Sequence, residues 1–236
     1  MSAEFRQRLA RRLDWQRGIH DPALEPRNGL PILPGLRRWQ AARLAASFGD
    51  FLADPSRRPA AEFFLADLYG DRDFSARDRD AARVLPMMSR LLPDTLLRAA
   101  TDAIELAVLS HALDLRMAQA LAGRRDPAAR VSDDDYARAY RQVGLPRLRA
   151  HQIALILRVG NSLDAAVRKH GVHKLLKAAR IPAQLAGLSE LQAFLERGFT
   201  AFGALGGAED FLNDLGERER LVSHRLFTGE AAPFQP

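Results

Sequence analysis

Apolar side chains recur every three or four positions along most of the chain, the spacing expected of amphipathic α-helices. The alternation of apolar and polar positions that marks a β-strand, with its β-branched residues, is missing. This pattern predicts one all-α, helical-bundle-like domain of about eight to eleven helices. The run over residues 94–122 is apolar around most of its circumference, so we expect a long central helix there.

Prolines and glycines divide this pattern into separate elements, because proline interrupts helical hydrogen bonding. A first helix is expected over residues 3–17, and residues 20–35 (HDPALEPRNGLPILPG) predict an irregular strap. Residues 1–35 therefore form an N-terminal helix and strap, and residues 36–236 form the helical domain. Its helices are expected over residues 36–53, 57–69, 76–92, 94–122, 133–143, 146–159, 162–170, 172–180, 188–205 and 208–227, with Gly160 and Gly171 as separators.

The stretch EFFLADLYG, residues 62–70, is apolar on two sides of its helix. Neighbouring helical residues point about 100° apart, so Phe63 and Phe64 face different directions. A helix that is apolar on two sides is usually packed on both, and we expect this one to run through the middle of the bundle. Packing alone does not account for Glu62 and Asp67, which would need polar partners or a wet pocket.

Composition excludes several classes of protein. Hydrophobic residues make up 47% of the chain, an ordinary value for a globular protein. No run approaches the roughly 18 consecutive apolar residues of a membrane-spanning helix. The charged N-terminal sequence lacks the apolar segment of a signal peptide, and there is no cysteine. We therefore expect a cytoplasmic protein with no membrane association and no disulfide chemistry.

The net charge of +6 is unevenly distributed. Only three of the 35 basic residues are lysines, a bias typical of a GC-rich bacterial genome rather than of a nucleic-acid surface. Residues 138–180 carry ten basic residues and one acid, whereas residues 181–236 carry four basic and eight acidic residues. Grouped charges of one sign create a directional field. We expect that field to come from a basic surface that contains Arg168, Lys169, Lys174 and Lys177.

This basic surface has two interpretations. It could attract an anionic small molecule or an acidic protein partner, or it could be a solvated face answered by the acidic C-terminal helices of the same chain. Nucleic acid is not the expected partner, because residues 141–193 contain no aromatic side chain on which a base could stack. The short helices of this region also show no polar recognition face.

Candidate chemistry lies on the expected central helix. His111 and Asp114 share its apolar sector three residues apart, and Glu105 lies on the opposite side. Because a buried polar group must find a partner, we expect His111 and Asp114 to hydrogen-bond each other close to the 62–70 helix. Phe63 and Phe64 would then form dry walls beside the pair. The pair either specifies packing or forms a site in which the carboxylate orients a basic or metal-bound imidazole.

A metal- or cofactor-dependent enzyme is therefore the alternative function. His111 and Asp114 would have to recruit Glu62, Asp67 or His151, because no Glu-x-x-His motif of the di-iron bundles is present. No P-loop, Gly-x-Gly-x-x-Gly, Gly-x-Ser-x-Gly or His-Glu-x-x-His motif occurs either. The sequence thus identifies no particular cofactor.

A second candidate surface lies on the helix expected over residues 36–53. Trp39 and Arg43 line up on its face away from the core, four residues apart. Such a pair can stack its planar groups, and tryptophan and arginine recur at binding surfaces. The alternative is an ordinary solvated face with one packed tryptophan.

Three stretches resemble a group of uncharacterised bacterial all-helical proteins: EFFLADLYGDRDFSARD, AIELAVLSHALD and FLNDLGERERLVSHRLFTG. Those proteins carry a Phe-Phe-Leu…Leu-Tyr-Gly…Asp-Phe stretch followed by a helical remainder, and the resemblance covers most of the chain from about residue 36 onward. It implies a single helical domain and brings no established activity with it. The three stretches contain Glu62, Asp67, Tyr69, Glu105, His111 and Asp114.

Taken together, these sequence features favour a binding or interaction module for an anionic small molecule or an acidic protein partner. The oligomeric state is left open. The candidate binding residues are His111, Asp114, Glu105, Glu62, Asp67, Tyr69, Trp39 and Arg43, beside the basic surface.

Overall fold

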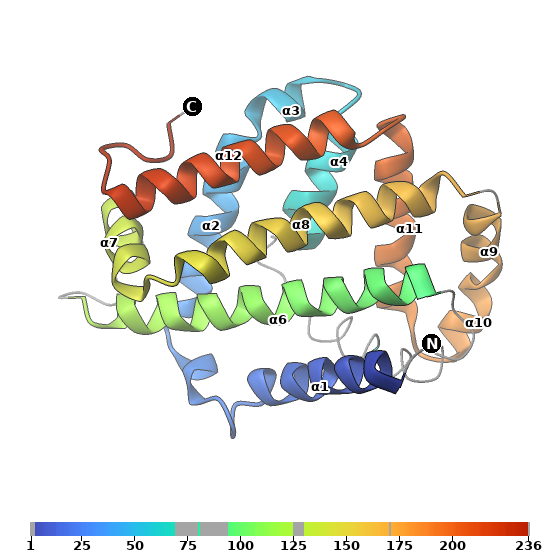
Figure 1. Cartoon of the computed structure of the whole chain (residues 1–236), viewed down its shortest axis with the longest axis horizontal. Coiled ribbons are helices and arrows are strands. Elements are labelled where there is room, and N and C mark those ends of the chain that lie inside the picture. The colour runs from blue at the N-terminus through green and yellow to red at the C-terminus, as the bar shows by residue number, and fades with distance from the viewer. Residues whose placement is uncertain (1–2, 69–79, 81–93, 125–129, 170, 236) are drawn as a thin grey trace.

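The computed structural model describes residues 3–68, 80, 94–124, 130–169 and 171–235 (Figure 1). Within this described part the chain forms eleven α-helices and no strand, which confirms the all-α prediction. A 3-10 turn, η1, and a π-helical turn, η2, complete the elements. In chain order they are α1 (Ala3–His20), η1 (Pro26–Gly29), α2 (Leu33–Ser47), α3 (Gly49–Ala53), α4 (Arg58–Phe63), η2 (Phe64–Leu68), α6 (Asp94–Ala122), α7 (Asp133–Val143), α8 (Pro146–Val167), α9 (Val172–Ala178), α10 (Arg180–Leu185), α11 (Ser189–Ala204) and α12 (Glu209–Thr228).

The long helices α1, α6, α8 and α12 lie side by side as one layer, and α2, α4 and α11 cross behind it (Figure 1). Helix α6 contacts α1 on one side and α8 on the other, and it also contacts α2 and α7. The expected central helix over residues 94–122 is therefore confirmed.

The buried apolar residues form two main clusters. The first joins α1, α2, α6 and α7 around side chains such as Leu36 and Leu115, which are fully buried. The second is largely aromatic and joins η2, α11 and α12 through Phe64, Phe202 and Phe211.

The two adjacent phenylalanines of EFFLADLYG share Phe202 as a neighbour, and each also packs on a further aromatic ring. The ring centroid of Phe63 lies 5.4 Å from that of Phe194, and the ring of Phe64 lies 5.7 Å from that of Phe211. Both side chains are buried, so the prediction that this segment is packed on two sides is confirmed for the part that the structure describes. Tyr69 lies outside the described residues.

Gly160 does not end a helix, contrary to the sequence prediction. Helix α8 runs without interruption from Pro146 to Val167, through the gap expected between residues 159 and 162. A Cβ atom on Gly160 would lie 2.5 Å from Cδ2 of Leu212 on α12. The glycine therefore allows α8 and α12 to approach closely, and its role is in helix packing rather than in a turn.

Other boundaries differ by a few residues. Helix α2 begins inside the expected strap, at Leu33. Pro34 is compatible with this start, because a backbone N–H in the first turn has no acceptor within the helix and proline lacks only that group. The helix expected over residues 36–53 is divided at Phe48 into α2 and α3. The helix expected over residues 76–92 lies outside the described residues, apart from Asp80. None of the described helices combines the length and apolar character that crossing a membrane requires.

Candidate functional site

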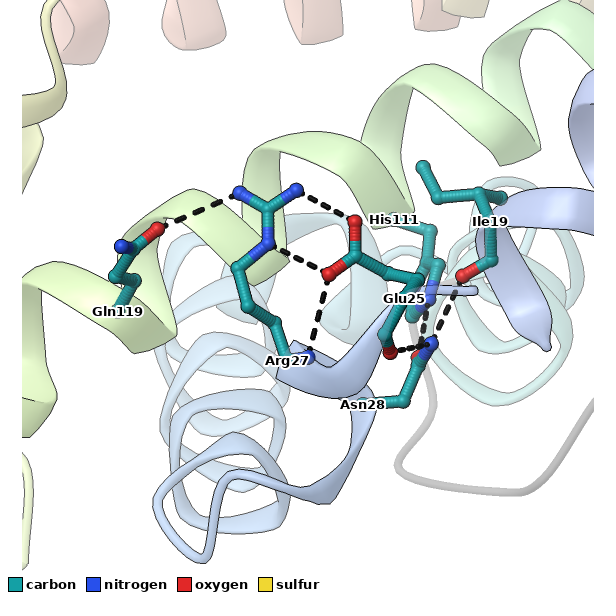
Figure 2. A network of polar contacts seen from close by, with 6 residues as sticks. All are labelled: Ile19, Glu25, Arg27, Asn28, His111 and Gln119. Carbon is teal, nitrogen blue, oxygen red and sulfur yellow. Dashed lines mark hydrogen bonds and ion pairs between the residues drawn. The ribbon is translucent and has the colours of Figure 1, made fainter. Parts of the chain in front are cut away.

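His111 is buried in the middle of α6 and is held through both of its ring nitrogens. Nη2 of Arg37, on α2, lies 3.0 Å from Nδ1, and Oδ1 of Asn28 lies 2.8 Å from Nε2. A guanidinium has no lone pair and only donates, so Nδ1 accepts. The ring proton is therefore on Nε2, which donates to Asn28. Figure 2 shows Asn28, itself a residue of the strap, facing His111.

The strap itself is fixed by the same asparagine. Nδ2 of Asn28 donates to the backbone oxygens of Ile19 and Glu25, each at 2.9 Å (Figure 2). The carboxylate of Glu25 accepts from Nε and Nη2 of Arg27 at 2.7 and 2.6 Å, and this contact is the main reason why the pKa of Glu25 falls to about 2. These bonds tie α1, η1 and α6 together around one imidazole.

The surroundings of His111 keep its ring neutral. Burial is the largest cause, followed by the charges of His20 and Arg37, and together they lower the pKa of His111 to about 3. The His20 ring stacks on it with centroids 4.2 Å apart. Because both nitrogens are hydrogen-bonded, this arrangement offers no free lone pair to a metal ion or to a substrate proton.

Asp114 has a different partner from the one predicted. Its Oδ1 accepts a 3.0 Å hydrogen bond from Nε2 of Gln40 on α2. The expected His111–Asp114 hydrogen bond is wrong, because both nitrogens of His111 are already bonded to Arg37 and Asn28. Burial raises the pKa of Asp114, against the opposing effects of the Gln40 hydrogen bond and of two positive charges, Arg37 and Arg149.

Phe63 and Phe64 do not wall this site either. They belong to the aromatic cluster, whereas the residues that contact His111 come from α1, the strap and α2. That expectation is also wrong, and its physical reason is that periodicity assigns a residue to a face of its own helix but not to a neighbour.

The remaining predicted residues are dispersed. Glu105 bonds Arg12 on α1 at 2.8 Å and His151 on α8 at 2.9 Å. Asp67 is buried and accepts from Nε and Nη2 of Arg197, with a shortest distance of 2.6 Å. Glu62 is exposed. These carboxylates therefore serve separate helix contacts rather than one common pocket.

The predicted Trp39–Arg43 stack is not formed. The Trp39 ring stacks on Tyr136 of α7, with centroids 4.1 Å apart and planes at 23°. Arg43 instead pairs with Glu219 of α12 at 2.7 Å. Both side chains thus hold helices together, as in the alternative of a packed tryptophan.

No group of three or more histidine and acidic side chains comes close enough to hold a metal ion within the residues that the structure describes. His111, Glu105 and Asp67 each have partners on other helices, and these partners differ. The arrangement brings none of the predicted metal-binding combinations together.

The residues of the predicted basic surface belong to α9 and to the segment that follows α8. Lys169, Lys174 and Lys177 are exposed, whereas Arg168 pairs with Asp164 of its own helix at 2.6 Å. Sequence reasoning missed the apolar side chains beside these lysines. Leu175 of α9 is 68% exposed, and Ile181 and Leu185 of α10 are 67% and 85% exposed. Their signal in the sequence is a row of large apolar residues on helices too short to bury them all.

Arg149 was also missed, although it is one of the few charged side chains that α8 buries. It is only 6% exposed, and its guanidinium carbon lies 4.6 Å from the centroid of the Tyr140 ring. The signal is positional, because Arg149 precedes Ile153 and Ile156 by four and seven residues on the same buried face. An arginine on such a face needs either a partner or a ligand.

A family model described as "Domain of unknown function (DUF8198)" matches residues 20–233. That range includes the strap, His111, Arg149 and the basic surface. No curated protein and no solved structure matches the chain.

Proposed function

The chain belongs to this DUF8198 family of domains, and from its own surface we propose that it is an interaction module that docks an acidic segment of another protein on α9 and α10. The observation that carries the proposal is the exposure of Leu175, Ile181 and Leu185 beside three lysines. Soluble domains rarely expose large apolar side chains in groups unless the group binds something.

Helices α9 and α10 are anchored to α11 by polar contacts. Nε2 of Gln192, on α11, donates to the backbone oxygen of Leu176 at 2.7 Å. Nε and Nη2 of Arg180, on α10, bond the carboxylate of Glu196 at 2.9 and 2.6 Å. Helix α9 also contacts α8 and α10. The apolar side chains are therefore presented on an anchored surface, which reduces the ordering cost of binding.

The charges beside these apolar residues favour an acidic partner. Two acidic side chains nearby form ion pairs with arginines: Asp164 pairs with Arg168, and Glu196 pairs with Arg180. Among the described residues, no ion pair is formed by Lys169, Lys174 or Lys177. The acids here pair with arginines, although Glu196 also feels the charge of Lys177, so internal compensation reaches the lysines only in part and leaves charge for a partner.

The partner segment that fits this surface combines carboxylates with large apolar side chains. An amphipathic helix can place apolar anchors on Leu175, Ile181 and Leu185 while its acidic residues face the lysines. The apolar contact would supply most of the affinity, and the charges would supply orientation and association rate.

The alternative of a metal- or cofactor-dependent enzyme around His111 and Asp114 has no observation in its favour. Both ring nitrogens of His111 are engaged, and Asp114 is bonded to Gln40. We therefore assign these residues to the fold rather than to a reaction.

A selection of displayed random peptides against the whole chain tests the docking proposal without knowing the partner. Peptides rich in aspartate, glutamate and large apolar residues should be enriched, and their binding should weaken as salt screens the lysines. Leu185→Ser and the pair Lys174→Glu and Lys177→Glu should each reduce binding about tenfold or more. Leu24→Ser is the matched control, because Leu24 is 71% exposed and lies in the strap.

Four results would overturn the proposal. The selected peptides could be neutral or basic, or they could bind Leu185→Ser as tightly as the unmodified chain. Vesicles containing phosphatidylserine could bind instead of peptides, which would make the surface a membrane contact. Sedimentation could also show a dimer that Leu185→Ser dissociates, in which case the occupant is a second copy of this chain.

A further inference from the structure

Arg149 carries two hydrogen-bond donors that no described residue satisfies. Its Nη1 lies 3.3 Å from Oε1 of Gln152, but Nε and Nη2 are buried and have no partner in the described part of the chain. The side chain is more than nine-tenths buried, so bulk water does not reach these two donors. Leaving buried donors of a charged group unpaired is costly, and native structures seldom do it without a reason.

The unpaired edge is the one that arginines use to grip an oxyanion. The Nε–H and Nη2–H bonds of a guanidinium form a fork that matches the two oxygens of a carboxylate or phosphate. Three other arginines of this chain use that same edge on carboxylates, namely Arg27 on Glu25, Arg180 on Glu196 and Arg197 on Asp67. Arg149 is more deeply buried than these three and lacks the oxyanion that each of them binds.

The carboxylate of Asp114 does not fill this place. Asp114 feels the charge of Arg149, but its Oδ1 is bonded to Gln40 and no ion pair joins it to Arg149. Burial raises the pKa of Asp114, which weakens it as a counter-charge. On the other side Arg149 rests on the Tyr140 ring, whose hydroxyl bonds Ser223 at 2.9 Å. The guanidinium is therefore oriented and buried, yet its charge is not matched by a carboxylate in contact.

A groove of about 200 Å³ opens next to this position, between α8 and α12. It contains Ser223, and Pro146, Ala150 and Ile153 of α8 border it on either side of Arg149 in sequence. Arg220 and His224 of α12 also line it, so its polar side favours a negative ligand. The hydroxyl of Ser223, which lines the groove, bonds the hydroxyl of Tyr140, on whose ring Arg149 rests.

We propose that the Nε and Nη2 edge of Arg149 binds the oxyanion of a small ligand, a carboxylate or a phosphoryl group, which enters through the groove between α8 and α12. The volume is below the about 300–1,000 Å³ of pockets for drug-sized molecules, so the ligand is small. This site is separate from the surface of α9 and α10, and neither proposal depends on the other.

Titration of the whole chain with inorganic phosphate and with acetate tests this site, and acetamide serves as the uncharged counterpart of acetate. One of the two anions should raise the midpoint of thermal unfolding saturably, which also identifies the class of oxyanion, and acetamide should have no effect. Arg149→Met keeps an apolar stem but removes the fork, and it should weaken the binding about tenfold or more. Arg147→Met is the matched control, because Arg147 is exposed on the same turn of α8.

A direct measurement covers the case in which Arg149→Met fails to fold. The Nε–Hε resonance of Arg149 in the unmodified chain should shift and become protected from exchange as the anion is added, whereas that of Arg147 should not. An unchanged Arg149 resonance throughout both titrations would overturn the proposal. So would a stabilisation that is equal in Arg149→Met and Arg147→Met, or one that grows without saturation for every salt.

Discussion

Arg37 donates a hydrogen bond of 3.0 Å from its Nη2 to Nδ1 of His111, and this contact decides the protonation of the ring. A guanidinium cannot accept a hydrogen bond, so the lone pair of Nδ1 points at Arg37. Nε2 therefore carries the ring proton and donates a hydrogen bond to Asn28. The histidine that the sequence marks as candidate chemistry is a neutral connector between α2, α6 and the strap. Protonating it would place a cation against Arg37.

The first prediction concerns the pH dependence of stability. The pKa of His111 is about 3 in the folded chain and about 6.5 when unfolded, so between these values the unfolded state binds one more proton. The free energy of unfolding therefore falls as pH falls through this window, by about 2 kcal/mol between pH 7 and pH 5. Urea unfolding at both pH values measures it.

His111→Gln is the control for that measurement, because glutamine can accept from Arg37 and donate to Asn28 without titrating. Its stability should change less between pH 7 and pH 5 than that of the unmodified chain. Glu25, whose pKa falls to about 2, adds its own loss only below its ordinary pKa of 4.5, outside this interval. Parallel losses in both chains would contradict a buried neutral His111.

The second prediction concerns the strap. Asn28→Ala removes three hydrogen bonds, to Ile19, Glu25 and His111, and leaves Nε2–H of a buried imidazole without its acceptor. We expect the free energy of unfolding to fall by about 2–3 kcal/mol. Gln119→Ala removes only a 3.4 Å contact to Arg27 at the surface, and it should change stability by less than about 0.5 kcal/mol. Equal effects of the two substitutions would show that Asn28 does not fasten the strap.

The sequence predicted the burial of His111 but not its partners, and the reason lies in sequence separation. Helical periodicity places His111 on the apolar sector of its own helix, and the structure agrees. Its partners, Arg37 and Asn28, are 74 and 83 residues away. Asp114, one turn along, was the only candidate that local spacing could offer. Choosing between a local and a distant partner requires knowing how α2 and the strap cross α6.

The charge pattern of the sequence predicted a basic region, but the sequence did not reveal which apolar side chains are exposed beside it. The uneven distribution of charge pointed to the lysines of α9, which are exposed, and their role as one basic surface stays a prediction. Leu175 and Leu185 carry the same apolar signal as core leucines, and only the packing of α9 and α10 on α11 shows that they stay outside. Arg149 is the converse case, since an arginine in a basic segment gives no sign of being buried.

The third prediction concerns Asp67, whose buried carboxylate accepts hydrogen bonds from Arg197 on α11. Arg197→Met should lower the free energy of unfolding by about 1–3 kcal/mol, because it removes the charged donors of a buried acid. Adding Asp67→Asn should recover part of that loss, since the amide tolerates the position without a guanidinium. Arg180→Met should cost less, because the Arg180–Glu196 pair lies at the surface. Chemical unfolding of the unmodified chain, of Arg197→Met, of Asp67→Asn and of the double variant gives the coupling. An additive double variant would show that the pair is not coupled.

The last prediction uses two glycines that look alike in sequence. Gly160 in α8 faces Leu212 so closely that an added Cβ would lie 2.5 Å from Cδ2 and 3.0 Å from Cδ1. Leu212 is itself buried, so its side chain has little room to move aside. Gly160→Ala should therefore lower the free energy of unfolding by about 1–3 kcal/mol. Gly18, in α1, has no atom within 4 Å of an added Cβ, so Gly18→Ala should raise it by up to about 0.5–1 kcal/mol through helix propensity.

A double variant separates the close contact from a helix-propensity effect at Gly160. If the α8–α12 contact is the cause, Gly160→Ala should cost less in a chain that already carries Leu212→Ala, because the smaller side chain leaves space for the new methyl group. Propensity alone would make alanine favourable at Gly160 in both backgrounds, as at Gly18. A stabilising Gly160→Ala in the unmodified chain would mean that α8 and α12 lie further apart than the structure places them. A destabilisation that Leu212→Ala relieves would establish that this glycine sets the distance between the two helices that enclose the groove beside Arg149.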